Sequence, residues 1–164
     1  MSVVTGDICL CDWGESESSE RISLRSEVQP LDLRAPEVIL SVKPWTSAID
    51  IWNFGALILE VVEKKQMFKA RDSSGYYDPQ QHLQQIVNFF GPLPQSLLEQ
   101  GRQEIVGHIN QADLSREALL QNSSPEGYAL ITFLTDVMVI DPAQRPTATQ
   151  LIDNSWFASD PDQI

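Results

Sequence analysis

Few side chains in this sequence have the type and spacing for chemistry, and one of them is the carboxylate of Glu37. It lies in the segment LRAPEVIL, residues 33–40, where an aliphatic run follows it directly. Removing a carboxylate from water beside apolar residues is costly unless a cation pairs with it. We therefore expect a basic group from a distant part of the chain to neutralise Glu37.

Residues that ligate soft metals are sparse. Cys9 and Cys11 are the only two cysteines and lie one residue apart, while the two histidines, His82 and His108, lie far from them and from each other. Structural zinc sites need a second ligand pair at a defined spacing, which this sequence lacks. We interpret the cysteines as small apolar residues on one face of a strand and expect no zinc site.

The elements that must position such residues are mostly helices. Residues 47–62 are apolar around nearly the whole circumference of a helix, which predicts a helix in the middle of the protein. Residues 79–90 follow an N-cap Asp and end at a Gly, and two further helices are predicted within 125–154. Residues 8–11 predict a short buried strand, and the polar stretch 15–29 predicts an exposed loop. Capping boxes are indicated at Ser47 and at Thr147.

Composition and charge bound the function. The 164 residues are 42% hydrophobic and 21% charged, which is typical of a single globular domain with a real core. Eleven basic against 23 acidic residues give a net charge of -12, which repels nucleic acid and anionic membrane surfaces. The start lacks the pattern of a secretory signal, and the apolar stretch 49–62 is too short and polar to span a bilayer. We expect an intracellular protein, cytoplasmic or nuclear, with no membrane or nucleic-acid partner.

Five short motifs follow one another along the chain. They are Asp12-Trp13-Gly14, Ala35-Pro36-Glu37, Asp50 with Trp52 and Gly55, the loop DPAQRPTA at 141–148, and Asn154-Ser155-Trp156-Phe157. Their order resembles the C-terminal lobe of a eukaryotic protein kinase domain. Within that superfamily, residues 82–94 resemble the group of cyclin-dependent and SR-protein kinases, and residues 33–40 with Pro44-Trp45 most resemble SR-protein-kinase-like sequences of fungi.

This resemblance implies a mainly α fold, with kinase C-lobe helices around a central buried helix and a short β-strand or hairpin remnant at the N-terminus. It implies one partial kinase domain over residues 1–164. Its parts would be an activation segment at about 12–37, the central helix at about 47–62, an insert typical of the cyclin-dependent kinase group at about 92–123, and final helices at about 125–154.

The resemblance also implies roles for single residues. Glu37 would pair with Arg145, whose planar guanidinium suits bidentate contact with a carboxylate. Asp50 would brace the catalytic loop from the central helix, with Trp52 and Gly55 as structural residues beside it. The plainer interpretations are that Arg145 is a surface charge before a helix and that Asp50 is an ordinary first-turn Asp.

Asp12 occupies the position of the family's magnesium-binding Asp, so it would ligate Mg²⁺ and, through it, ATP in a complete domain. In this chain alone a turn residue that caps backbone N–H groups is the favoured interpretation. The Gly-rich loop, the strand Lys, its Glu partner and the His-Arg-Asp loop have no counterpart, and only eleven residues precede Asp12. We expect part of a serine/threonine kinase domain that contains no catalytic residue, does not bind ATP tightly alone and is inactive by itself.

Two departures from the family pattern keep an alternative open. Pro30 and Leu33 stand where serine/threonine kinases carry a Thr that contacts the catalytic Asp and a Tyr. The alternative is a non-catalytic, pseudokinase-like binding module that presents the helix near 82–90 and the adjoining insert to a docking partner. In the first hypothesis the partner is a protein substrate. A third possibility is that the chain is unstable alone, because a strand edge and part of the central helix would be uncovered.

Overall fold

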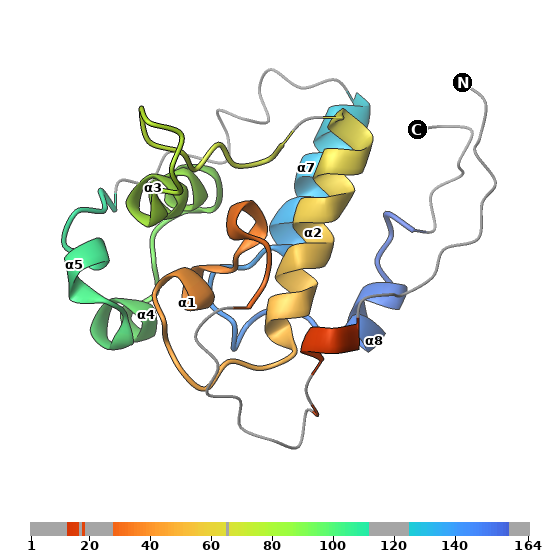
Figure 1. The fold of residues 1–164 in the computed structure, drawn as a ribbon. Helices are drawn as coiled ribbons and strands as arrows, with labels where there is room; N and C mark the ends of the chain where they lie inside the picture. The colour runs from red at the N-terminus through yellow and green to blue at the C-terminus, as the bar shows by residue number, and fades with distance from the viewer. Residues whose placement is uncertain (1–12, 17, 19–27, 65, 112–124, 158–164) are drawn as a thin grey trace.

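The structure is a computed structural model that describes residues 13–16, 18, 28–64, 66–111 and 125–157, and it is mainly helical (Figure 1). Two 3-10 turns precede the helices, η1 at Trp13–Glu15 and η2 at Leu31–Leu33. The described helices are α1 (Pro36–Ile39), α2 (Ala48–Glu63), α3 (Pro79–Phe90), α4 (Gln95–Gln100), α5 (Gln103–Val106), α7 (Pro125–Val137) and α8 (Ala148–Ile152). This confirms the predicted fold class.

Helix α2 is the longest described helix and lies against α7, as Figure 1 shows. Its inner face carries Trp52 and Ala56, both fully buried. Gly55 lets the two helices approach closely, because a Cβ there would meet Cγ of Met138 and would lie 3.2 Å from Cγ1 of Val137. The Gly of the predicted motif is therefore explained by packing, since no larger residue fits without displacing α7 side chains.

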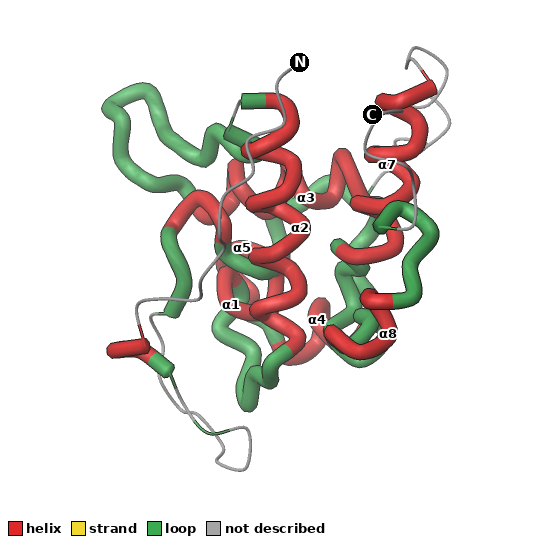
Figure 2. The backbone as a smooth tube through the Cα atoms, turned by 90° about the vertical axis from the view of Figure 1, so that its right-hand side faces the viewer, coloured by secondary structure: helices red, strands yellow, loops and turns green. Residues whose placement is uncertain are grey.

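The short helices gather around α3 on the other side of the core. Helix α1 contacts α3, and α3 contacts α5, while η2, which precedes α1, contacts α2. Figure 2 shows these helices joined by loops, with no strand in the described part. Arg71 and Tyr77 form an isolated antiparallel bridge in the loop that leads into α3.

Aromatic side chains fill the core in two groups beside the first half of α2. Trp52 stacks on Phe68 with ring centroids 6.5 Å apart and meets the edge of Phe90 at 5.6 Å. Phe133 of α7 stacks on Trp156 at 4.3 Å. Such pairs stabilise a fold beyond the burial of their area, and here they join α2 to α3 and α7 to the segment after α8.

Local signals predicted several helix ends correctly. The side chain of Asp78 accepts hydrogen bonds from the backbone N–H groups of Gln80 and Gln81, and Gly91 ends α3 with a φ of 100°. Thr147 and Gln150 form the predicted capping box at α8. The capping box at Ser47 is not formed, because Ser47 is already helical and its hydroxyl makes no cap hydrogen bond.

The prediction that α2 is surrounded on all sides is met on its inner face only. Leu57, Val61 and Val62 are 51%, 64% and 42% exposed, and no described element covers them. The apolar residues around a helix predict that it prefers to be buried, but not whether neighbouring elements exist to cover it.

The predicted strand at residues 8–11 and part of the predicted insert, 112–123, lie outside the described residues. In the described parts, no helix has the length and apolar character needed to cross a membrane.

Candidate functional site

The buried ion pair between Glu37 and Arg145 joins two of the predicted motifs. Nη1 of Arg145 lies 2.7 Å from Oε1 of Glu37, and Nη2 lies 3.1 Å from Oε2, which is a bidentate contact. The two residues are 2% and 6% exposed. The contact that the sequence motifs predicted is therefore present, between residues 108 positions apart.

Every nitrogen of this guanidinium has partners beyond the carboxylate. Nε donates to the carbonyl oxygen of Val139 at 2.9 Å, Nη1 to that of Ala48 at 2.6 Å, and Nη2 to that of Ile140 at 3.3 Å. The guanidinium carbon also lies 5.2 Å from the ring centroid of Trp52. Arg145 thus satisfies the start of α2 and the end of α7 at once, and five donors in a planar fork make that arrangement specific to Arg.

Two features of the segment before Glu37 position this residue, a Pro at the start of α1 and the side chain of Gln29. Ala35 and Pro36 open α1, with Pro36 at the first helical position where its missing N–H is not needed. Gln29 holds this segment to α2, since its Nε2 donates to the carbonyl oxygen of Ile49 at 2.8 Å and its Oε1 accepts from the N–H of Ala35 at 3.0 Å. No pattern in the sequence singles out Gln29, because its role depends on a tertiary contact.

Other predicted residues lie along α2. Asp50 is exposed at one edge, but partial burial on the other side raises the pKa of its carboxyl above the usual value. Nε1 of Trp52 and Oδ1 of Asn53 are buried, and neither has a hydrogen-bond partner in the described part of the chain. Trp52 lies on the inner face of α2, whereas Asn53 lies one helical turn before the exposed Leu57, so the unused acceptor of Asn53 adjoins the apolar side chains of the exposed side.

Asp12, the predicted magnesium ligand, lies outside the described residues, so the structure does not place it. Within the ranges that are described, no three His, Cys, Asp or Glu side chains come together as a metal site. The described residues alone therefore do not supply a ligand set for Mg²⁺, and no step of chemistry through the metal is derived from them.

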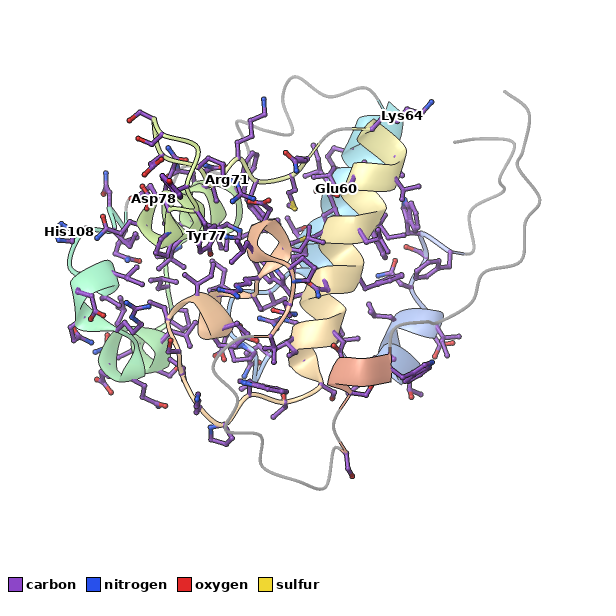
Figure 3. All side chains as sticks on the ribbon, in the orientation of Figure 1. Glu60, Lys64, Arg71, Tyr77, Asp78 and His108 are labelled. Atoms are coloured by element: carbon purple, nitrogen blue, oxygen red, sulfur yellow. The ribbon has the colours of Figure 1, made fainter. Side chains whose placement is uncertain are left out.

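A second polar cluster lies where α1 faces α3, and sequence reasoning missed it. Oη of Tyr77 is 3.0 Å from Nδ1 of His82, which is fully buried, and Arg34 lies over the Tyr77 ring at 5.8 Å from its centroid. Burial, aided by the positive charge of Arg34, lowers the pKa of His82 to about 4, and burial raises the pKa of Tyr77 to about 12. Figure 3 labels Tyr77, Asp78 and Arg71 on the segment that leads into α3.

Comparison with known proteins agrees with this geometry. The family described as "Protein kinase domain" matches residues 1–157. A serine/threonine protein kinase of Aspergillus fumigatus is 29% identical over 160 residues, which cover 90% of this chain and 39% of that protein. The mitogen-activated protein kinase MKC1 of Candida albicans is 29% identical over 159 residues, covering 92% of this chain and 30% of that protein. Serine/threonine-protein kinase SKY1 of Saccharomyces cerevisiae is 25% identical over 151 residues, covering 80% and 19%.

The chain thus spans less than half the length of these relatives. The family match nevertheless extends over nearly all of its residues, and the buried Glu37–Arg145 pair joins two of the motifs that first suggested a kinase. On this evidence the chain belongs to the protein kinase domain family.

Proposed function

We propose that this chain forms the C-terminal lobe of a serine/threonine protein kinase domain similar to the SR-protein kinases. The observation that carries the proposal is the ion pair of Glu37 with Arg145, which ties the end of an activation segment at about 12–37 to the central helix and to the loop before α8. This arrangement holds the segment that would receive a protein substrate against the helical core. We propose that residues 1–164 form one partial kinase domain, with the parts that the sequence motifs indicate.

The free side of α2 supports this proposal. Leu57 and Val61 are more than half exposed, while Oδ1 of Asn53, one helical turn before Leu57, has no hydrogen-bond partner in the described residues. Apolar surface and unsatisfied polar atoms on one helix favour a further packed segment. In the family that segment includes the catalytic loop, and Asp50 would brace its backbone.

In the complete domain, the γ-phosphoryl group of ATP would pass to a Ser or Thr hydroxyl, with Mg²⁺ neutralising the phosphate charge. Asp12 is the residue of this chain that we propose as its ligand. The 164 residues contain no Gly-rich loop, strand Lys or His-Arg-Asp loop, so we propose that they do not transfer phosphate without those parts.

The net charge of -12 favours basic protein substrates, which fits a kinase of Ser-Arg sequences. We propose an intracellular location, cytoplasmic or nuclear.

A chimeric protein tests this function. The part of the Aspergillus fumigatus relative that precedes its counterpart of Asp12 is joined to residues 12–164, and transfer of labelled phosphate from ATP to a Ser-Arg repeat peptide is measured. We expect transfer by the chimera, none by the 164-residue chain, and none by the chimera with Asp12→Ala. Transfer by the chain alone at the rate of the chimera would contradict the proposal.

A non-catalytic binding module is the second candidate, and Pro30 favours it. This residue precedes η2, is exposed, and offers no hydroxyl where active serine/threonine kinases carry a Thr. A chimera that melts cooperatively but transfers no phosphate would favour this candidate. Restoration of transfer by Pro30→Thr in the same chimera would identify the missing hydroxyl as the cause.

A further inference from the structure

A pocket of about 250 Å³ opens where α1, the start of α3 and the turn between α4 and α5 meet. None of its wall residues belongs to α2, so the pocket is separate from the free face of that helix. Its wall contains two cationic side chains, three apolar ones and two that carry a hydroxyl group. They are Arg34, Val38, Ile39, Ser41, Tyr77, Pro79 and Arg102.

The charges in this wall are both positive, although the chain as a whole carries -12. Among the described arginines, Arg34 is the one with no carboxylate in ion-pair contact, since Arg71, Arg102 and Arg145 pair with Asp32, Glu104 and Glu37. Its only hydrogen bond in the described residues is a long one, 3.4 Å from Nε to the carbonyl oxygen of Gln29. Both Nη atoms of Arg34 therefore remain available to a ligand.

Arg102 also keeps donors free. Its Nε contacts Oε1 of Glu104 at 2.8 Å, but its two Nη atoms have no partner in the described residues. The side chains of this pair are 47% and 65% exposed, and such surface pairs are weak and readily exchanged. The contact shows that Arg102 can bind a carboxylate in its present conformation.

The remaining wall is apolar and fixed in place. Val38 and Ile39, the two residues after Glu37, belong to the core, and Pro79 begins α3. The Tyr77 ring carries Arg34 above it and is held by the buried His82. A ligand would therefore meet a preformed surface, which lowers the entropy lost on binding.

We propose that this pocket binds an acidic peptide segment of a protein partner, with a Glu side chain whose carboxylate lies between Arg34 and Arg102 and whose methylene groups contact Pro79 and Tyr77. A carboxylate fits better than a phosphate dianion. Asp32, Asp78 and Glu104 stand close to the wall, and they and the net charge of the chain repel a dianion about twice as strongly as a monoanion. The inference does not depend on kinase activity.

Fluorescence anisotropy with defined probes tests this site on the full 164-residue chain. The probe is a fluorescein-labelled peptide with a Leu-Glu-Leu centre between Gly-Ser flanks, and its twins carry Gln or phosphoserine in place of Glu. We expect saturable binding of the Glu probe and at least about tenfold weaker binding of the Gln twin, because charge-assisted hydrogen bonds are lost. Arg34→Gln and Arg102→Gln should each weaken the Glu probe about tenfold.

Lys69→Gln is the matched control, because it removes one positive charge from an exposed residue outside the pocket wall. It should change the affinity by less than about twofold. Thermal melts of each variant verify folding, and Arg102→Gln, at an exposed position, keeps the test valid if Arg34→Gln unfolds. The proposal is overturned by no binding below about 1 mM, by equal binding of the Gln twin, or by an unchanged affinity in Arg102→Gln. Tighter binding of the phosphoserine twin would overturn the carboxylate assignment.

Discussion

At the scale of single residues, Arg145 is the position where a substitution should cost most. Arg145→Ala would leave Glu37 as an unpaired carboxylate at 2% exposure and free three carbonyl oxygens. Removing one partner of such a pair typically costs about 3–5 kcal/mol. We expect a loss of that size in the free energy of unfolding, measured by urea denaturation.

Two further variants give this prediction its controls. Arg145→Lys keeps the charge but cannot reach five acceptors from a planar fork, so its loss should be intermediate. Arg102→Ala breaks an exposed ion pair, which should cost at most about 1 kcal/mol. An unfolding midpoint of Arg145→Ala equal to that of the wild type would contradict a stabilising role for the pair.

His82 predicts a pH dependence of stability. Its pKa is about 4 in the folded protein, below the usual 6.5, because burial disfavours the charged imidazolium. Below pH 6.5 the unfolded chain binds the proton more readily, so the contribution of His82 is fully present above that pH and is lost as the pH falls towards 4. The total loss is about 3 kcal/mol. Urea denaturation across this range, compared with His82→Asn, measures it.

Asn is the chosen replacement because its side-chain oxygen can take the place of Nδ1 towards Tyr77 and does not titrate. The carboxylates of the chain also titrate in this range and act on both proteins alike. The difference between wild type and variant therefore isolates His82. A difference that stays constant between pH 6.5 and pH 4 would refute the assignment of a neutral, buried imidazole.

At the scale of elements, the contact of α2 with α7 depends on Gly55. Helix propensity alone favours Gly55→Ala by about 1 kcal/mol. A Cβ at this position would instead collide with Met138, which is fully buried and cannot swing into solvent. We expect a net destabilisation of about 1–3 kcal/mol, the usual cost of overpacking, measured by thermal melting.

The sign of the change decides this prediction, since a stabilised Gly55→Ala variant would mean that the helices have room to move apart. A double-mutant cycle with Met138→Ala identifies the cause. If the collision is responsible, the double variant should lose less stability than the sum of the two single variants.

The elements also show which structural signals are local. The ends of α3 and α8 could be predicted because Asp78 and Thr147 bond to N–H groups within three residues. The cap at Ser47 was predicted on the same pattern and is absent; instead, the hydroxyl of Thr46 accepts from the N–H of Ala48 at 3.3 Å, and the carbonyl oxygens of Thr46 and Ser47 accept from the N–H groups of Ile49 and Asp50. The acceptors at the start of α2 are therefore still local, but the capping hydroxyl lies one residue earlier than the capping-box spacing indicated.

At the scale of the whole molecule, the sequence predicted the helical class and the partner of Glu37, but the latter only through motifs that resemble a kinase. The apolar residues beside Glu37 predict that a cation from elsewhere in the chain pairs with it. They do not indicate which basic residue supplies that cation. The pocket at Arg34 and Arg102 could not be predicted, because its wall comes from segments that meet only after folding. The apolar pattern of α2 predicted burial on all sides, whereas the kinase resemblance predicted that part of the central helix would be uncovered, as Leu57 and Val61 are.

That exposed face carries the last prediction, which concerns association of the whole chain. Leu57 and Val61 lie one helical turn apart and next to Val62, so their apolar surface is contiguous. Burying this apolar surface between two copies of the chain is favourable, and we expect the average mass in sedimentation velocity to rise with protein concentration.

Val61→Lys should lower this association while changing the unfolding free energy by no more than about 0.5 kcal/mol, because residue 61 is 64% exposed. Tyr76→Lys, at an exposed aromatic on the loop before α3, is the matched control and should leave association unchanged. Equal effects of the two substitutions would mean that added positive charge, not the face of α2, governs association.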